Sequence, residues 1–393
     1  MRPIQRRAGR TPYAPWRIVN AAARGLAAAL ALAALGLAVL ASGAAMAADA
    51  GTESTEARST AKTSADMVSP PLAGLNLAGG EFGAAPGVYG RDYIYPSPAE
   101  FDYAKAKGFA VVRIPFLWER LQPRARGPFD QAEQARLVQV VEEATARGLG
   151  VILDLHNYGR REGAIVGSDA APVEMFTDFW RRMGVVFGGR KGVIFGLMNE
   201  PHDQPVDGWA RAAEAAVAAI RATGACTPIL IPGANWSGAH SWYGPREGVS
   251  NAQAMGKIAR AGTTLFEFHQ YLDPDSSGTG AVCRTPAEAA GALRIATRWL
   301  RAHKAQGFLG EFGAPDSPQC LAGLEAMIDH MRANADVWAG WAYWAAGAWW
   351  PKTYPLSVQP VDGVDRPQMA ALAKAATGVK PLSACQMPGA PEP

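Results

Sequence analysis

Eight short runs of almost continuous apolar residues recur at similar intervals along the chain. In order they are Gly74–Ala78, Ala110–Pro115, Gly150–Leu155, Val193–Met198, Pro228–Pro232, Thr264–Phe268, Phe308–Phe312 and Gly340–Trp344. Runs without alternating polar positions are typical of strands that are buried on both faces of a parallel sheet. The pattern therefore predicts eight strands of this kind.

The segments between the runs carry helix signals. An N-cap residue followed three positions later by glutamate marks a helix start, and this pair occurs at Ser97/Glu100, Asp130/Glu133 and Thr285/Glu288. Gly108 and Gly148 stand where helices should end. Eight strand–helix repeats predict a single (β/α)8 TIM barrel of the α/β class. The competing architecture, a doubly wound open sheet, usually has a glycine-rich phosphate loop after its first strand, and the sequence from Gly74 to Gly80 does not match that loop.

The first 47 residues have the features of a leader. Six arginines and no acid precede an uncharged stretch of 24 residues, Gly25–Ala48, that ends in Ala45-Met46-Ala47. This order of basic, apolar and small residues is typical of a secretory signal peptide. We expect a signal peptide over 1–47, a flexible lead-in over 48–70, the barrel over 71–385 and a flexible tail over 386–393. The alternative is an uncleaved membrane anchor, because the uncharged stretch could cross a bilayer.

Composition and charge narrow the classes of function. Hydrophobic residues make up 49% and charged residues 19% of the 393 residues, which favours a large core over disorder. Without the arginines of the leader, 32 basic residues remain against 35 acidic ones, a net charge of −3. This balance argues against nucleic acid as a partner, since nucleic-acid binding needs a positive surface.

Four cysteines, Cys226, Cys283, Cys320 and Cys385, all follow the leader. An even number in an exported protein predicts two disulfides, and four residues allow three pairings. Buried thiols are the alternative. None of the four has the C-x-x-C spacing of zinc and redox sites, so we expect no metal to be bound by them.

Polar residues stand at the C-terminal ends of most of the apolar runs. They are Arg113, Asp154-Leu155-His156, Asn199-Glu200, Asn235-Trp236, His269-Gln270-Tyr271, Glu311 and Tyr343-Trp344. A single charged residue in such a place is commonly a paired structural ion, because burial of an unpaired charge costs free energy. Seven strands that all carry polar residues at the same end predict a shared active site, which barrel enzymes build at this rim.

Two glutamates in this set indicate the chemistry. Glu200 and Glu311 follow the fourth and seventh runs, which a barrel places across its mouth. Two carboxyl groups that flank a sugar can cleave a glycosidic bond, since one protonates the leaving oxygen and the other acts at the anomeric carbon. Retention of configuration needs about 5–5.5 Å between the carboxyl groups and inversion about 6.5–9.5 Å. The sequence predicts a glycosidase without fixing this distance.

Several motifs resemble glycoside hydrolase family 5, most closely its subfamily 5, the secreted endo-β-1,4-glucanases of bacteria and fungi. The motifs are Leu153–Tyr158, Met198–Asp203, Gly233–Trp242, His269–Asp273 with Ser276–Thr279, Leu309–Gly313 and Tyr343–Gly347. The resemblance extends from about Gly74 to Trp350. One departure lies at the first strand, where Glu81 adds a third acid, either at the edge of the substrate cleft or in solvent.

The resemblance implies a retaining double displacement with Glu200 as acid/base and Glu311 as nucleophile. Arg113 and a hydrogen bond from Tyr271 would keep Glu311 ionised, whereas Glu200 would start protonated. The family pattern further implies that Asn199 holds the sugar 2-hydroxyl and that Trp344 forms the platform under the sugar. His156, His269, Asn235 and Trp236 match binding or supporting positions.

Other aromatic residues are open to two interpretations. Each either extends the cleft or packs in the core or at the rim: Trp118, Tyr158, Trp242, Trp349 and Trp350. We expect no metal at the histidines and no cofactor. Cys283–Cys320 matches the disulfide of the family, and a Cys226–Cys385 pair follows from barrel geometry, which puts both residues on the lower face.

The resemblance implies a secreted endo-β-1,4-glucanase, extracellular or periplasmic, that acts on a β-glucan polysaccharide. We expect a monomer without stable membrane association once the leader is removed. The same chemistry on mannan or xyloglucan is the closest alternative. A glycan-binding barrel that has lost catalysis is the alternative from another class.

Overall fold

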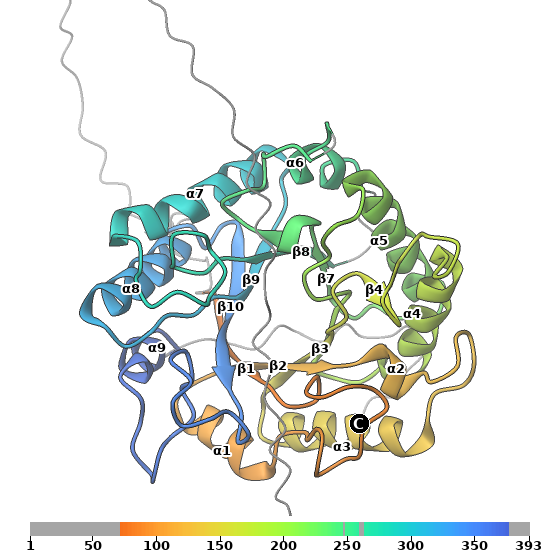
Figure 1. Cartoon of the computed structure of the whole chain (residues 1–393), viewed down its shortest axis with the longest axis horizontal. Coiled ribbons are helices and arrows are strands. Elements are labelled where there is room, and N and C mark those ends of the chain that lie inside the picture. The colour runs from red at the N-terminus through yellow and green to blue at the C-terminus, as the bar shows by residue number, and fades with distance from the viewer. Residues whose placement is uncertain (1–70, 247, 259–262, 377–393) are drawn as a thin grey trace, which may run out of the picture. The chain divides into compact units, whose positions relative to one another are not determined.

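The computed structural model describes residues 71–246, 248–258 and 263–376. The predicted leader, lead-in and tail therefore lie outside the described residues. Eight parallel strands form a closed barrel in the order β1-β10-β9-β8-β7-β6-β3-β2 (Figure 1). They are β1 Leu72–Leu77, β2 Val111–Phe116, β3 Gly150–Leu155, β6 Val193–Gly196, β7 Ile229–Pro232, β8 Thr264–His269, β9 Gly307–Glu311 and β10 Trp338–Ala346. Each predicted apolar run corresponds to one strand, so the barrel prediction is confirmed.

Helices surround the barrel (Figure 1). They are α1 Pro98–Ala106, α2 Trp118–Leu121, α3 Gln131–Ala146, α4 Val173–Phe187, α5 Val206–Arg221, α6 Asn251–Met255, α7 Pro286–Ala302, α8 Pro318–Ala333 and α9 Gln368–Ala376. A small antiparallel pair, β4 Arg160–Arg161 and β5 Ala164–Ile165, lies outside the barrel sheet. Within the described residues, no helix combines the length and apolar character that a membrane crossing requires.

The predicted helix signals lie at the ends of helices. Thr285 and Glu288 form a complete capping box at the start of α7. At the start of α3, Asp130 accepts a hydrogen bond from the Glu133 N–H. Gly108 and Gly148 follow α1 and α3 with φ of +90° and +71°, a left-handed conformation that glycine adopts without steric cost.

The barrel interior is built in layers. An apolar layer takes one residue from each strand: Leu72, Val111, Ile152, Ile194, Leu230, Leu265, Phe308 and Ala342. Two positions further along their strands stand Arg113, Asp154 and Glu267, all fully buried. Residues two apart share one face of a strand, so a charged layer lies above the apolar layer, toward the C-terminal ends of the strands. The fold thus forms a polar floor beneath the barrel mouth.

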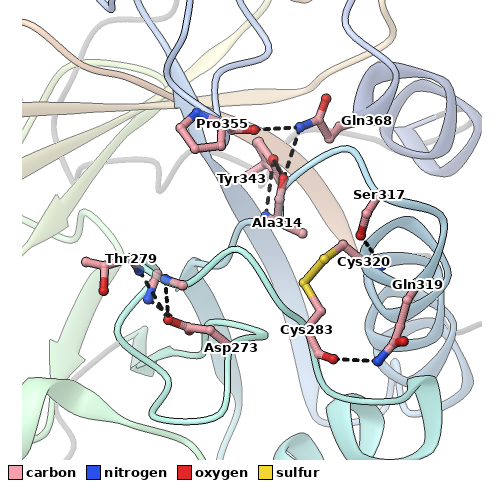
Figure 2. Close-up of a disulfide and its surroundings, with 12 residues drawn as sticks. Asp273, Thr279, Cys283, Ala314, Ser317, Gln319, Cys320, Tyr343, Pro355 and Gln368 are labelled. Atoms are coloured by element: carbon pink, nitrogen blue, oxygen red, sulfur yellow. Dashed lines mark hydrogen bonds between the residues drawn. A yellow bond between two sulfur atoms is a disulfide. The ribbon is translucent and has the colours of Figure 1, made fainter.

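One disulfide joins the loop after β8 to the first turn of α8. Cys283 and Cys320 are bonded, with their Cα atoms 5.2 Å apart (Figure 2). This pairing was expected from the family resemblance and is confirmed. Cys226 is not a free thiol, and Cys385 lies outside the described residues, so the pairing of these two stays a prediction.

Candidate active site

Arg113 lies at the centre of the charged layer. Its guanidinium is 3.0 Å from Asp154, 3.2 Å from Glu267 and 2.9 Å from Glu311. Burial would lower the pKa of Arg113, but the three carboxylates outweigh burial and raise it. The same guanidinium lowers the pKa of Asp154 against the effect of burial. One cation is thus shared by three carboxylates.

Two asparagines orient the guanidinium. Asn76 on β1 accepts from Arg113 Nη1, and Asn199 accepts from Nη2, both at 2.9 Å. The Nδ2 of Asn76 donates to main-chain oxygens of β9 and β10. Because Asn199 Oδ1 is engaged by Arg113, the amide is held with its Nδ2 free of any protein acceptor among the described residues.

Glu311 is the last residue of β9 and is held at both carboxylate oxygens. Arg113 donates to Oε1 at 2.9 Å, and the Tyr271 hydroxyl donates to Oε2 at 2.8 Å. Both bonds stabilise the ionised carboxylate. A side chain does not fit at the preceding residue, Gly310, since a Cβ there would lie 2.0 Å from Glu267 Oε1. Glycine therefore precedes Glu311 because the Glu267 carboxylate packs closely against this backbone.

Glu200 lies four residues beyond β6 in a strained backbone conformation. Its φ is +43°, which is uncommon for a residue other than glycine and is found preferentially at functional sites. Its side chain is 17% exposed, against 5% for Glu311. Glu200 Oε1 lies 2.9 Å from His269 Nδ1. The two glutamates thus meet at the barrel mouth, with Glu200 the more accessible.

His269 ends β8 and lies close to three carboxylates. Its Nδ1 is 2.9 Å from Glu200 and 3.6 Å from Glu311, and its Nε2 is 3.4 Å from Glu267. Burial would lower the pKa of His269, but the charge of Glu311 and the hydrogen bonds with Glu200 and Glu267 raise it to about 10. At neutral pH the pair of His269 and Glu200 therefore holds a proton next to the second carboxylate.

A register shift explains how His269 reaches Glu311. The pairing of β8 with β9 shifts between Phe268 and His269, so that His269 lies beside Glu311. A bulge of this kind redirects side chains at the rim of a barrel. Three side-chain atoms lie within 4.8 Å of one another: one carboxylate oxygen of Glu200, one of Glu311 and one ring nitrogen of His269. These atoms could also act as ligands of a metal ion.

His156, Tyr158 and Trp344 form an aromatic wall. His156 Nδ1 is 2.7 Å from Asp154, and its ring stacks on Trp344 at 5.6 Å between centroids. Burial would lower the pKa of His156, but Asp154 raises it. The Tyr158 hydroxyl is 3.3 Å from His156 Nε2. Trp344 is half-buried and donates through Nε1 to the Tyr354 hydroxyl at 3.1 Å.

Asn235 and Trp236 belong to a short segment with an unusual backbone. The residues of the 3-10 helix Asn235–Ser237 all have φ near +55°. The Trp236 ring stacks on His202 at 4.7 Å and 9°, and it is 44% exposed. The backbone N–H of Trp236 donates to Pro201 O at 3.1 Å, which holds this residue beside the Glu200 segment.

The structure brings most of the predicted residues together. One network contains Arg113, Asn199, Glu200, His269, Tyr271 and Glu311, with His156 and Trp344 joined through Asp154. Trp118 and Trp242 are fully buried in the core, so the interpretation that they extend the cleft is wrong. Tyr158, itself part of the aromatic wall, contacts His156, and Trp350 contacts Trp344 of that wall.

Glu81 is enclosed rather than solvated. Its Oε2 accepts from the Gly79 N–H at 2.8 Å, and its Oε1 is buried without a hydrogen-bond partner. Burial raises the pKa of Glu81 to about 7, although His156 acts in the opposite direction. The solvent-exposed interpretation of this third acid is therefore wrong.

Sequence reasoning did not assign Asn76 and Glu267 to the site, and it placed Asp154 at the rim without a role. These three residues complete the shell around Arg113. The available signal was a polar residue inside an apolar strand, two positions above an apolar interior residue. Glu267 also stands two positions before His269, which predicts the same face of β8.

Comparisons with known proteins agree with this geometry. A family model described as "Cellulase (glycosyl hydrolase family 5)" matches residues 65–347. Endo-beta-1,4-glucanase B of Aspergillus niger is 36% identical over 293 residues, which are 74% of this chain and 85% of that protein. The crystal structure of endo-beta-1,4-glucanase Xac0029 from Xanthomonas axonopodis pv. citri is 46% identical, with a TM-score of 0.78, and the match covers 79% of this chain and 99% of that one. A structure of XacCel5A in complex with cellopentaose is also 46% identical, with a TM-score of 0.77 and coverage of 78% and 99%.

Proposed function

The chain belongs to glycosyl hydrolase family 5, and from this membership we propose that it is a secreted endo-β-1,4-glucanase that acts by a retaining double displacement. Glu311 is the nucleophile and Glu200 the acid/base. The observation that carries the proposal is the approach of these two carboxyl groups to within 4.8 Å of each other and of His269.

The separation of the carboxyl groups supports retention. Retaining glycosidases have about 5–5.5 Å between them, whereas inverting enzymes have about 6.5–9.5 Å because a water must fit on the far side of the sugar. One carboxylate oxygen of Glu200 and one of Glu311 lie within 4.8 Å of each other, which favours the shorter spacing.

In the first step, a lone pair of Glu311 forms a bond to the anomeric carbon while the glycosidic C–O bond breaks. The departing oxygen takes a proton from Glu200. His269 lies 2.9 Å from Glu200, and its pKa of about 10 means that the pair retains a proton at neutral pH. Strongly interacting groups titrate as a unit, so we assign the acid function to the pair, with Glu200 as the group that faces the substrate.

In the second step, Glu200 removes a proton from a water molecule that attacks the anomeric carbon. The bond to Glu311 breaks and its carboxylate is restored. Arg113 and Tyr271 donate to that carboxylate at 2.9 and 2.8 Å, which makes Glu311 a better leaving group in this step. The same two donors therefore support departure of the nucleophile as well as its ionised starting state.

Three contacts are proposed for the sugar next to Glu311. Asn199 Nδ2 is available to donate to a hydroxyl because Arg113 occupies its Oδ1. His156 and the half-buried Trp344 stack on each other, so the indole is held as a rigid surface. The exposed ring of Trp236 supplies a second surface for sugar stacking. Two such rings suit a chain of several glucose units, such as the cellopentaose bound by the similar structure.

The test of the proposal is the stereochemistry and the pattern of hydrolysis. Proton NMR of cellopentaose hydrolysis should show the β-anomer of the new reducing end first, with the α-anomer appearing later by mutarotation. An initial α-anomer would contradict the assignment of Glu311 as nucleophile. Product profiles on barley glucan, carboxymethylcellulose and mannan should show internal cleavage of the two glucans, and faster release from mannan would favour the alternative substrate.

Secretion is proposed from the leader pattern of residues 1–47. N-terminal sequencing of the exported protein should begin near Ala48, and a chain that retains residues before Ala45 would contradict cleavage at this site. The monomeric state and the absence of stable membrane association stay predictions, which size-exclusion chromatography and fractionation of cells would check.

A further inference from the structure

The loop after β8 begins with Gln270, and its second residue contacts the proposed nucleophile. This residue is Tyr271, whose hydroxyl donates to Glu311. The two ends of the loop are joined, since the Arg284 N–H donates to Leu272 O at 2.7 Å. Cys283 ties the same end to α8 (Figure 2). Such closed surface loops are compact and often functional.

The carboxylate of Asp273 organises this loop. It is buried and accepts hydrogen bonds from the N–H groups of Gly278, Thr279 and Gly280 at 2.9, 3.1 and 2.9 Å. The Ser277 hydroxyl adds a fourth bond at 2.8 Å. Figure 2 shows the Asp273 side chain pointing toward Thr279 across the loop. Successive backbone N–H groups around an anion form a nest, and charge-assisted bonds are about twice as strong as neutral ones.

Asp273 has no cation to explain its burial. Among the described residues, no lysine, arginine or histidine lies within ion-pair distance of its carboxylate. The four donors of the loop are therefore its stabilising partners, and the fold of the segment depends on them. Removal of the charge should release the segment from its present conformation.

The organised segment packs against Tyr271. Gly278 has φ +72°, and a Cβ at this position would lie 2.7 to 3.0 Å from three atoms of the Tyr271 ring. The backbone of Gly278 thus lies against the ring itself. Since the ring is confined on this side, its hydroxyl is directed at Glu311 Oε2, which it contacts at 2.8 Å.

We propose that Asp273 is a positioning residue for the nucleophile, acting through Gly278 and Tyr271 on Glu311. The proposal rests on the proposed function, because it takes Glu311 as the nucleophile. The carboxylate folds the loop, the loop confines the phenol ring, and the phenol hydroxyl donates to the reacting carboxylate. Asp273 itself touches neither Glu311 nor a sugar bound beside it.

Five variants of the full-length protein test the chain of contacts. They are Asp273→Asn, Gly278→Ala, Tyr271→Phe, the double variant Asp273→Asn/Tyr271→Phe, and Asp329→Asn as control. Asp329 is the control because it is an exposed aspartate of α8, outside this loop, that pairs with Arg332 of the same helix. The assay is the pH dependence of kcat and KM on dinitrophenyl β-cellobioside, whose acidic leaving group needs no proton from Glu200.

Asp273→Asn should lower kcat by about tenfold with little change in KM, the signature of a lost transition-state interaction. The loss of kcat without a rise in KM is the readout that a merely structural role would not produce. Gly278→Ala should act in the same direction, since the added methyl displaces the ring. In the Tyr271→Phe background, Asp273→Asn should lower kcat further by less than about threefold, because the effects of residues that act through one another are not additive. Asp329→Asn should match the wild type.

Additive losses in the double variant, or an unchanged kcat while only the melting temperature falls, would show a purely structural role and overturn the proposal. If Asp273→Asn does not fold, a folded Gly278→Ala decides the question through its kcat and KM, since its methyl group presses on the Tyr271 ring. Its melting temperature separately reports the backbone strain at φ +72°. A folded wild-type protein that released no dinitrophenolate would contradict the proposed function and this inference together. An active wild type with additive losses contradicts the inference alone.

Discussion

At the scale of single residues, the two glutamates differ by their neighbours. Glu311 is nearly enclosed and bound by Arg113 and Tyr271, whereas Glu200 is more accessible and contacts His269. Such a difference in surroundings is what the proposed division into an acid/base and a nucleophile requires.

Replacement of each glutamate should separate the two roles. Glu311→Gln should abolish turnover of every substrate, because the amide cannot form the glycosyl–enzyme bond. Glu200→Ala should lower hydrolysis of cello-oligosaccharides by about 10²–10⁴-fold, the usual worth of general acid–base catalysis. On dinitrophenyl cellobioside its first step should be spared. Initial rates of phenolate and sugar release measure both effects.

Azide supplies the control for Glu200→Ala. A small anion can attack the glycosyl–enzyme without a general base, so it should restore turnover of the dinitrophenyl substrate and yield the β-glycosyl azide. Equal losses on activated and natural substrates, with no response to azide, would contradict the assigned roles. The Glu311→Gln variant should not respond to azide in this way.

The histidine between the glutamates predicts a pH dependence of stability. The pKa of His269 is raised from 6.5 to about 10 in the folded chain, so the folded state binds more protons than the unfolded state between these values. The stabilisation is complete below about pH 6.5 and is lost as the pH rises through about 10, by up to roughly 1.4 kcal/mol per pH unit for one proton. His156, whose pKa is also raised, acts in the same direction.

Urea unfolding at pH 6.5, 8 and 9.5 measures this dependence. The free energy of unfolding should fall steadily across the series. His269→Asn should start less stable and show a flatter decline, because one of the two titrating histidines is absent. A wild-type stability that rises from pH 6.5 to 9.5 would contradict the assigned protonation of His269.

At the scale of elements, strand registers and loops decide where these residues meet. The shift between β8 and β9 sets His269 beside Glu311, and Gly310 leaves the space that Glu267 fills. The loop between β8 and α7 then supports Tyr271 from the outside. The site therefore depends on the conformation of connecting segments as much as on the strands.

The disulfide of this loop should contribute measurably to stability. Cys283 and Cys320 are separated by 37 positions, and closing a loop of that length lowers the entropy of the unfolded chain by the equivalent of about 4 kcal/mol. The double variant Cys283→Ser/Cys320→Ser should lose stability of this order in urea unfolding. An unchanged midpoint and slope would show that the bond constrains the unfolded chain little.

At the scale of the whole molecule, barrel closure assembles the site. β1 pairs with both β2 and β10, so the first and last strands of the barrel are neighbours. The shell around Arg113 takes residues from β1, β2, β3, β8 and β9. No fragment of the barrel contains the complete set, and the site should not survive opening of the sheet.

Unfolding should therefore remove activity and structure together. In guanidinium chloride, the midpoints of enzymatic activity, tryptophan fluorescence and far-UV circular dichroism should coincide for the wild type, as for a cooperative unit. In Cys283→Ser/Cys320→Ser, activity should be lost first, because the loop that supports Tyr271 can open without the barrel. Activity loss at lower denaturant in the wild type would show that the site opens independently.

The sequence alone determined the barrel and the identity of the two central acids. Continuous apolar runs of strand length are typical of a sheet covered on both faces. Asn199-Glu200-Pro201 and Gly310–Gly313 lie next to those runs in the chain. Such local signals can be read without knowledge of the fold, because each depends on residues that are close in sequence. The family resemblance that these motifs carry also predicted the Cys283–Cys320 disulfide.

Only the tertiary structure decided the roles of Asn76, Glu267 and Asp273, and whether Trp118 and Trp242 reach the substrate or the core. Each of these depends on the distance between atoms from segments far apart in the chain, which strand register and loop conformation set. A buried carboxylate looks the same in a sequence whether it binds an arginine or a loop backbone. The separation of Glu200 from Glu311, on which the choice between retention and inversion depends, is likewise a property of the closed barrel.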